Sequence, residues 1–225
     1  MKRIVISGVS RGIGEGVCRR FLEAGWIVHG FGRSAPACSG AWSERFRFHR
    51  RDMADLNGLT EACSEVPGPV DVLLCNAASF GDLAYHSHDF DHAVFLETLA
   101  VNLIAPAVMA RELKSALLQS GQGLLAFMST GNASLGGNTE GTMLAYRTSK
   151  SALNQLVRNL AAEWGGEGLT TVALNPGWVR TAMGGENAPT SVEEACGDIF
   201  QFLTERANSS LNGAFVNVDG SPLPW

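Results

Sequence analysis

The segment SGVSRGIG, at residues 7–14, carries the main signal for the fold class of this sequence. It follows a short β-branched run and carries glycines at Gly8, Gly12 and Gly14. Gly8 permits a sharp turn off a strand, Gly12 lets the backbone approach a ligand closely, and Gly14 lets the next helix pack near the sheet. A helix that starts here presents unsatisfied N–H groups and a positive dipole end, which suit a pyrophosphate. The stretch therefore predicts a dinucleotide-binding loop between the first strand and the first helix.

Outward from this loop, strand and helix patterns alternate along the whole chain. Short apolar runs predict strands, and apolar residues at helical spacing predict helices between them. The expected strands are 4–7, 27–31, 46–48, 70–75, 123–129, 169–175 and 213–218, and the expected helices are 12–24, 55–63, 89–119, 145–164 and 191–205. This alternation predicts a single α/β domain over 1–225, a Rossmann fold with a doubly wound, mostly parallel seven-stranded sheet.

The composition limits the classes of partner. The chain has 225 residues, 45% of them hydrophobic and 17% charged, which is typical of a compact globular protein. A net charge of -5 gives no general attraction to nucleic acid or anionic membranes. No apolar run approaches the roughly 20 residues of a membrane span, and the N-terminus lacks the long apolar core of a signal peptide. We expect a cytoplasmic protein without a nucleic-acid or membrane partner.

The cysteines and histidines do not indicate a metal site. The five cysteines are scattered and include no CxxC pair, which favours free thiols in a reducing compartment. His86, His88 and His92 lie close together with two aspartates, but no second ligand cluster accompanies them. A solvated loop before a helix, with Asp89 or Asp91 as the N-cap, is the preferred interpretation.

The end of the second expected strand distinguishes between two dinucleotides. An acidic residue there would bind the adenosine 2′-hydroxyl of NAD. The segment HGFGRS (29–34) has no carboxylate and instead places Arg33 and Ser34 after Gly32, with Arg11 in the glycine loop. Two guanidinium groups and a hydroxyl suit a 2′-phosphate, because the arginine fork matches phosphate geometry. We therefore expect NADP, with NAD the less favoured cofactor.

Tyr146 and Lys150 form the candidate catalytic pair. They lie four residues apart on the expected helix 145–164, so both side chains face the same way. A free phenol has a pKa near 10 and transfers protons poorly at neutral pH, whereas a neighbouring ammonium stabilises the phenolate. The pair can then act as a general acid–base group.

These motifs together resemble the short-chain dehydrogenase/reductase family. They occur in that family's order and at its spacings across essentially the whole chain, and the finer pattern is most like its C-factor (C-signal) branch, which includes carbonyl reductase-like members. The motifs are SGVSRGIG (7–14), CNAA (75–78), VNL (101–103), AYRTSKSALNQL (145–156) and NPGWVRTAM (175–183).

The resemblance implies a role for each matching residue. Tyr146 is the catalytic tyrosine, Lys150 holds the nicotinamide ribose hydroxyls and keeps Tyr146 acidic, and Asn102 completes a proton relay through water. Asn76 steadies the sheet beside the cofactor. The implied cofactor-binding set is Gly8, Ser10, Arg11, Gly12, Ile13 and Gly14 at the phosphates, Arg33 and Ser34 at the ribose, Asp52 and Met53 at the adenine, Asn76 and Ala77 at the end of the fourth strand, Tyr146 and Lys150, and Pro176, Gly177, Val179 and Thr181 at the nicotinamide.

Two positions depart from the family pattern. CNAA ends in Ala78 where the family usually has glycine. The family's catalytic serine closes the fifth strand, where this chain reads FMSTGNASLGG. Alignment places Thr130 there, and threonine keeps a hydroxyl that can hydrogen-bond a substrate carbonyl. Ser129 or Ser134 could supply that hydroxyl instead, and the sequence leaves the choice open.

The expected function is reversible hydride transfer between NADP(H) and a small carbonyl or alcohol. Loop 183–190 is expected to cover part of the active site, with Trp178 beside the nicotinamide. The alternative is a dinucleotide-binding signalling or regulatory protein of C-factor type with little turnover, because a fold alone does not settle function. In this family the helices at 97–119 and 145–164 commonly form interfaces, so a homodimer or homotetramer is expected.

Overall fold

A seven-stranded parallel sheet organises the part of the chain that the computed structural model describes, residues 1–37, 40, 44–81 and 87–225. The strand order is β3-β2-β1-β4-β5-β6-β7, which reverses direction next to β1 as in a doubly wound fold. The predicted fold class is confirmed, with every strand pair parallel. The strands are β1 Arg3–Ser7, β2 Ile27–Gly32, β3 Phe46–Arg50, β4 Val72–Cys75, β5 Leu124–Met128, β6 Thr170–Asn175 and β7 Ala214–Asn217.

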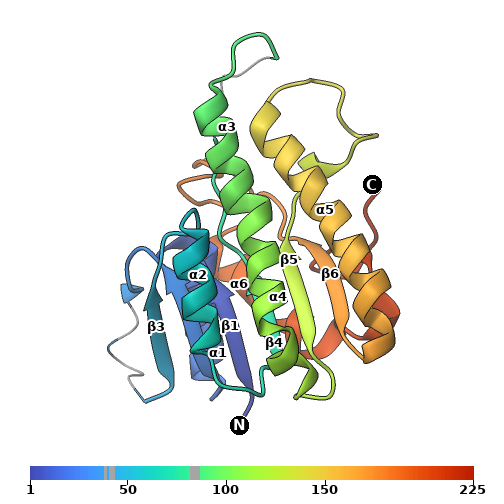
Figure 1. Ribbon diagram of the computed structural model, residues 1–225. Coiled ribbons are helices and arrows are strands. Elements are labelled where there is room, and N and C mark those ends of the chain that lie inside the picture. The colour runs from blue at the N-terminus through green and yellow to red at the C-terminus, as the bar shows by residue number, and fades with distance from the viewer. Residues whose placement is uncertain (38–39, 41–43, 82–86) are drawn as a thin grey trace.

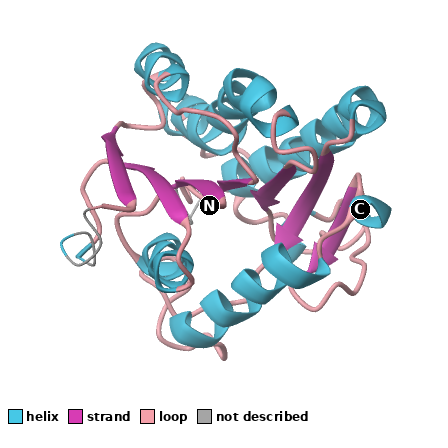
Figure 2. Ribbon diagram, turned by 90° about the horizontal axis from the view of Figure 1, so that it is seen from below, coloured by secondary structure: helices cyan, strands magenta, loops and turns pink. Residues whose placement is uncertain are grey.

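Helices cover both faces of this sheet, as Figures 1 and 2 show. One apolar core lies between the sheet and α2, α4 and α5, and the other lies between the sheet and the pair α1 and α6. The runs in β4 and β5 are apolar throughout because both of their faces are buried. The helices are α1 Gly12–Glu23, α2 Leu56–Ser64, α3 His92–Leu99, α4 Ala105–Leu118, α5 Leu144–Trp164 and α6 Val192–Gln201.

Short helical turns interrupt or follow these elements. A π-helical turn, Ala100–Ile104, joins α3 to α4, and another, Phe202–Arg206, follows α6. Asp55 and Asp91 cap α2 and α3, as the sequence predicted for Asp55 and allowed for Asp91. The 3-10 turns are Gly131–Ala133, Gly165–Glu167 and Ser209–Leu211.

The rod made by α3, the π-helical turn and α4 is more apolar than the sequence pattern suggested. Its span His92–Leu118 contains an 18-residue window of mean hydropathy 1.8, so length and composition alone would let it cross a membrane. One side of the rod is apolar because it packs in the core, where Met109, Leu113 and Leu117 are buried. Leu96 and Ile104 on the rod remain exposed, at 63% and 42%.

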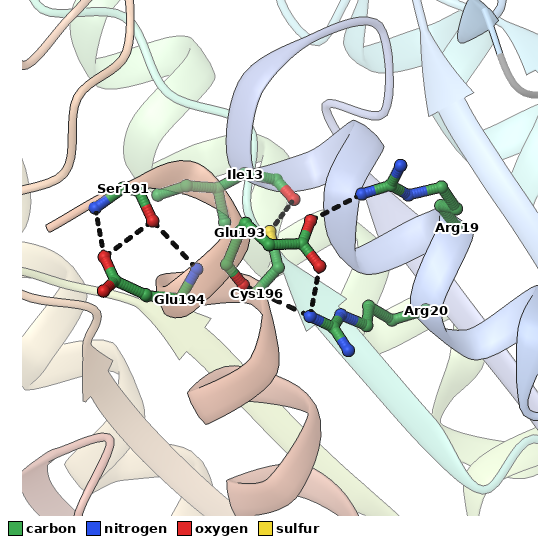
Figure 3. Close-up of polar contacts among 7 residues, drawn as sticks. All are labelled: Ile13, Arg19, Arg20, Ser191, Glu193, Glu194 and Cys196. Atoms are coloured by element: carbon green, nitrogen blue, oxygen red, sulfur yellow. Dashed lines mark hydrogen bonds and ion pairs between the residues drawn. The ribbon is translucent and has the colours of Figure 1, made fainter.

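The two helices on the other face are fastened to each other near the glycine loop (Figure 3). Glu193 at the start of α6 forms ion pairs with Arg19 and Arg20 of α1. The Cys196 thiol donates a hydrogen bond to the carbonyl oxygen of Ile13, 3.4 Å away. This contact needs Gly16, because a Cβ there would lie 2.5 Å from the Cys196 sulfur. The start of α6 thus contacts the first turn of α1 through Ile13 and its later part through Arg19 and Arg20.

The start of α6 is itself fixed by a capping box. The Ser191 hydroxyl accepts a hydrogen bond from the Glu194 N–H at 3.2 Å, and the Glu194 carboxylate accepts one from the Ser191 N–H at 2.9 Å (Figure 3). This reciprocal arrangement satisfies two helix-end donors and gives the chain that enters α6 a defined direction.

The cysteines that the structure describes are buried and form no disulfide: Cys18, Cys63, Cys75 and Cys196. Cys38 and His86 lie outside the described residues. Among the residues that are described, no three or more histidine, cysteine or acidic side chains gather in a way that could hold a metal ion.

Candidate active site

The glycine loop is shaped by its contacts with the end of β4. Gly8 has a φ of +77°, and a Cβ there would lie 2.8 Å from the Ala77 backbone. The Asn76 side-chain amide donates to the carbonyl oxygens of Ser7 and Gly8 at 3.0 and 3.3 Å. The Ser7 hydroxyl accepts from the backbone N–H groups of Asn76 and Ala77. The predicted residues Gly8, Asn76 and Ala77 therefore meet in one structural unit.

The loop leaves space where a dinucleotide needs it. Gly12 has a φ of +61°, and a Cβ there would meet only the Thr181 side chain, at 3.6 Å. Gly14, in contrast, faces the Gly8 carbonyl so closely that no side chain fits. Ile13 is half-buried against the core beneath α1. Open backbone at the N-terminus of a 12-residue helix fits a pyrophosphate.

A pair of serine contacts joins the glycine loop to the turn after β2. The Ser10 hydroxyl donates to the Ser34 carbonyl oxygen at 2.6 Å and accepts from the Ser34 N–H at 3.2 Å. Arg11 and Arg33, the chain neighbours of this pair, are both exposed. Neither forms an ion pair with the residues that the structure describes. Two available guanidinium groups thus flank one hydrogen-bonded junction.

The two residues expected at the adenine behave differently from each other. Asp52 is exposed, and its carboxylate accepts a hydrogen bond from the Ala54 N–H at 3.0 Å. The Met53 side chain is buried in the core with Leu59 and Phe31. A role for either in binding adenine stays a prediction.

Tyr146 and Lys150 lie together on the first turns of α5, and both are buried. The Lys150 ammonium lies 5.9 Å from the centre of the Tyr146 ring and donates a hydrogen bond to the Met128 carbonyl oxygen at 2.7 Å. The Phe80 ring stacks on the Tyr146 ring, with the two centroids 4.5 Å apart and an interplanar angle of 17°. The tyrosine is therefore enclosed by a cation, an aromatic ring and the end of β5.

Burial dominates the acidity of this pair. It raises the pKa of Tyr146 to about 12, and a hydrogen bond with the Thr130 side chain partly opposes the rise. Burial also lowers the pKa of Lys150 to about 8, while the nearby Cys75 opposes that shift. Both shifts have the same main cause, because desolvation disfavours the phenolate and the ammonium alike. The sequence-based expectation that Lys150 keeps Tyr146 acidic stays a prediction.

The three candidate hydroxyls occupy different surroundings. Thr130 follows β5 and is the one that hydrogen-bonds with Tyr146. The Ser129 hydroxyl is buried and donates to the Asn154 side chain at 2.6 Å. The Ser134 hydroxyl donates to the Trp225 carbonyl oxygen at 3.1 Å. Among the described residues, Thr130 is thus the one of these three with a hydrogen bond to the tyrosine.

Asn102 lies in the π-helical turn before α4 and is fully buried. Its side-chain oxygen accepts from the Ser79 N–H at 2.7 Å, and its amide donates to the Ser79 carbonyl oxygen at 2.8 Å and to the Ser149 hydroxyl at 2.9 Å. The Ser149 hydroxyl in turn donates to the Tyr146 carbonyl oxygen at 2.7 Å. The Asn102 side chain is therefore engaged with protein, so any contact with a relay water would fall to its backbone.

The loop after β6 reaches back over the glycine loop. Gly177 has a φ of +80°, and its N–H donates to the Asn175 side chain at 3.2 Å. Val179 is buried, whereas Pro176 is half-buried. Thr181 is the side chain that faces Gly12, so this loop and the glycine loop border one space.

The next stretch of that loop is held by its own hydrogen bonds. The exposed Trp178 donates from its indole nitrogen to the Gly184 carbonyl oxygen at 2.7 Å. The Arg180 side chain donates to the carbonyl oxygens of Ala188 and Pro189, both at 2.9 Å. A cavity of about 520 Å³ opens against Thr181, Ala182 and Gly185. The expectation that 183–190 covers the site stays a prediction.

Sequence reasoning missed Phe80 and Ser149. Ser149 lies inside the quoted motif YRTSK, and its place one residue before Lys150 could have marked it. Phe80 follows the CNAA motif without a pattern of its own, so only the folded structure brings its ring to Tyr146.

Comparison with known proteins agrees with this arrangement. Residues 2–191 match the family model for short chain dehydrogenases. The C-signal protein of Myxococcus xanthus is 34% identical over 166 residues, which cover 74% of this chain and 97% of that protein. The carbonyl reductase Sniffer of D. melanogaster has a TM-score of 0.90 and 27% identity, with 100% of both chains covered. A protein from Burkholderia multivorans, described as a short-chain dehydrogenase/reductase and solved with bound NADP, has a TM-score of 0.88 and 26% identity, with 100% of this chain and 99% of that chain covered.

Proposed function

The chain belongs to the short chain dehydrogenase family, and we propose that it transfers a hydride between NADP(H) and a small carbonyl or alcohol substrate. The observation that carries this proposal is the buried Tyr146, which hydrogen-bonds with Thr130 and lies beside Lys150. These three groups lie at the carboxyl end of β5 and the start of α5. In open parallel sheets, ligands bind at this edge.

Each residue of the site has a defined task in this proposal. The hydroxyls of Thr130 and Tyr146 bind the substrate oxygen, and Tyr146 donates the proton to it in reduction or accepts it in oxidation. Lys150 holds the ribose hydroxyls and supplies the positive charge that eases loss of the phenol proton. Asn102 fixes the helix and loop around Tyr146. A bound nicotinamide supplies or accepts the hydride.

NADP is the proposed form of the cofactor. Arg11 and Arg33 flank the Ser10–Ser34 junction and have no acidic partner among the described residues, which suits a 2′-phosphate. The space at Gly12 and the N-terminus of α1 suit the pyrophosphate. The B. multivorans relative with bound NADP supports the same assignment. Met53, Asp52, Val179 and Thr181 would border the remaining parts of the dinucleotide.

Tyr146→Phe tests the proposal directly. We measure NADPH oxidation with a panel of aldehydes and ketones, and NADPH binding by fluorescence. The variant should lose about 10²- to 10⁴-fold in turnover and still bind NADPH, because only the proton donor is removed. Full activity in Tyr146→Phe, or a purified chain that ignores dinucleotides, would contradict the proposal.

A second candidate is a dinucleotide-dependent signalling protein with little turnover. The likeness to C-signal favours it. The same assay separates the two: a wild-type chain that binds NADPH but turns over none of the panel supports the signalling function. The intact pair Tyr146 and Lys150 favours the enzyme.

We also propose that the chain is cytoplasmic and forms a homodimer or homotetramer through α3, α4 and α5. The exposed Leu96 and Ile104 offer apolar surface on this side. Leu96→Glu together with Ile104→Glu should halve or quarter the mass measured by light scattering. An unchanged mass would contradict this assembly.

A further inference from the structure

Phe80 touches the residue that is proposed to transfer the proton. Its ring lies nearly parallel to that of Tyr146, at 17°, with the centroids 4.5 Å apart. Phe80 itself is half-buried, whereas Tyr146 is 8% exposed. The phenylalanine therefore covers one face of the tyrosine, and stacking of two aromatic rings favours a defined angle between them.

The backbone on both sides of Phe80 is held in place. Asn102 binds both the N–H and the carbonyl oxygen of Ser79, at 2.7 and 2.8 Å. Gly81 has a φ of +68°, and a Cβ there would lie 2.8 Å from the Thr98 hydroxyl. The Gly81 N–H also donates to the Ser79 hydroxyl at 3.3 Å. Phe80 thus lies between two anchored residues and has little freedom to leave the tyrosine.

The same asparagine also fixes the tyrosine's own backbone. Asn102 donates to Ser149 at 2.9 Å, and Ser149 donates to the Tyr146 carbonyl oxygen at 2.7 Å. One buried amide therefore ties the loop of Phe80 and the helix of Tyr146 together. The two rings meet because their backbones share this anchor.

We propose that Phe80 is a positioning residue for proton transfer, which holds the Tyr146 phenol at its working angle and keeps water from one face of the ring. This inference rests on the proposed function of Tyr146. A side chain that merely fills space would do the second task but not the first. Replacements that keep or lose the flat ring can separate the two.

The groups around Tyr146 define what else can affect its titration. From α5, the Lys150 ammonium lies 5.9 Å from the ring. From the end of β5, Thr130 hydrogen-bonds with the phenol. Cys75 at the end of β4 acts through Lys150. Phe80 carries no charge, so removing it changes the solvation of the phenol and leaves these charges in place.

Three variants measure the effect on catalysis: Phe80→Trp, Phe80→Leu and Phe80→Ala. Phe80→Trp should keep kcat within about 2-fold, because it retains a flat ring. Phe80→Leu and Phe80→Ala should lower kcat by about 3- to 10-fold, with KM for NADPH unchanged, since a stacked pair contributes about that much. A Phe80→Leu variant with wild-type kcat would show that the ring has no orienting role and would overturn the proposal.

Phe90→Ala is the matched control. Phe90 also pairs with an aromatic ring, that of Phe95, with the centroids 5.7 Å apart, but it is 47% exposed and lies just before α3. This variant should keep the kcat of the wild type. A loss equal to that of Phe80→Ala would mean that breaking any aromatic pair slows the enzyme, which would also overturn the proposal.

A phenol titration gives a readout that does not need turnover. The chain has 2 tyrosines, so Tyr85→Phe leaves Tyr146 as the single phenol. Ultraviolet difference absorbance then follows its ionisation, with circular dichroism to confine the reading to the folded range. Phe80→Ala in this background should ionise at lower pH, because water reaches the ring. An unchanged titration would contradict water exclusion by Phe80. If the protein has no turnover at all, the proposed function fails while this titration still tests the ring contact.

Discussion

The Lys150 ammonium donates a hydrogen bond to the carbonyl oxygen of Met128, 2.7 Å away. Met128 is the last residue of β5, and Thr130 follows two positions later. The lysine thus ties α5 to the end of the strand that positions the threonine hydroxyl. The positive charge of Lys150 and its hydrogen bond to the backbone therefore both lie at the end of β5.

Lys150 should give the reaction a dependence on pH. Burial lowers its pKa to about 8, so the ammonium predominates below that pH and is lost as the pH rises through it. If the charged form is required, kcat/KM for carbonyl reduction falls above about pH 8. A pH–rate profile measures this. Lys150→Met should lose about 10²-fold or more at all pH values, and the exposed Lys2→Met should match the wild type. A flat wild-type profile up to the pH of unfolding would contradict the assignment.

Thr130 should be the hydroxyl that matters to catalysis. Thr130→Ser should retain most activity, whereas Thr130→Val, which keeps the shape and removes the hydroxyl, should lower kcat by about 10²-fold. Ser134→Ala is the control, since its hydroxyl bonds with the Trp225 carbonyl oxygen and not with Tyr146. Steady-state kinetics with one aldehyde measures all three. Equal losses of kcat in Thr130→Val and Ser134→Ala would contradict the assignment of the catalytic hydroxyl to Thr130.

Arg33 should set the cofactor preference. Arg33→Asp removes a cation from the proposed 2′-phosphate site and introduces repulsion, so KM for NADPH should rise by about 10-fold or more while KM for NADH stays level or falls. Arg111→Asp makes the same charge change at an exposed position on α4 and should alter neither value. An unchanged ratio of the two KM values in Arg33→Asp would count against NADP.

Gly16 and Cys196 should show strong coupling. A Cβ at Gly16 would lie 2.5 Å from the Cys196 sulfur, so Gly16→Ala should destabilise the fold by about 1–3 kcal/mol. Cys196→Ala removes the sulfur, and the double variant should therefore recover part of that loss. Urea unfolding of the four proteins in the cycle measures the coupling energy. Strict additivity would mean that the two residues do not meet.

His29 should make the fold sensitive to acid. Burial lowers its pKa from 6.5 to about 4, with His49 next in importance. The unfolded chain takes up a proton near pH 6.5 while the folded chain does not, so this stability is complete above pH 6.5 and is lost as the pH falls toward 4. The loss amounts to up to about 3 kcal/mol.

Urea unfolding at several pH values measures this loss. His29→Phe should reduce the acid sensitivity, whereas the exposed His92→Phe should leave it unchanged. Because burial also lowers the pKa of His49, part of the sensitivity should remain in His29→Phe. Identical pH curves for His29→Phe and the wild type would contradict the role of His29.

The fold was predictable because its signals are local. The glycine stretch 7–14 and the apolar runs of β4 and β5 reveal a strand, a turn and a two-sided sheet from neighbouring residues alone. The spacing of Tyr146 and Lys150 on one helix is local in the same sense. Each of these patterns can be recognised in the sequence because it lies within a short local segment.

The site was less predictable where it depends on distant residues. The choice among Ser129, Thr130 and Ser134 required knowing that Asn154 and Trp225 engage the two serines. The pKa of Tyr146 depends on burial by the whole fold, which spacing does not reveal. Phe80 and Tyr146 are 66 positions apart in the sequence, and no short motif spans that separation.

The fastening of α1 to α6 has a consequence for the order of synthesis. Ile13 emerges from the ribosome early, but the thiol that binds its carbonyl belongs to residue 196, and Glu193 pairs with Arg20 across 173 positions. Until that late segment emerges, the apolar underside of the first helix lies uncovered, and a nascent chain in this state is prone to aggregation. Chains truncated before α6 should therefore be aggregation-prone and depend on chaperones, even though they already contain every residue of the glycine loop.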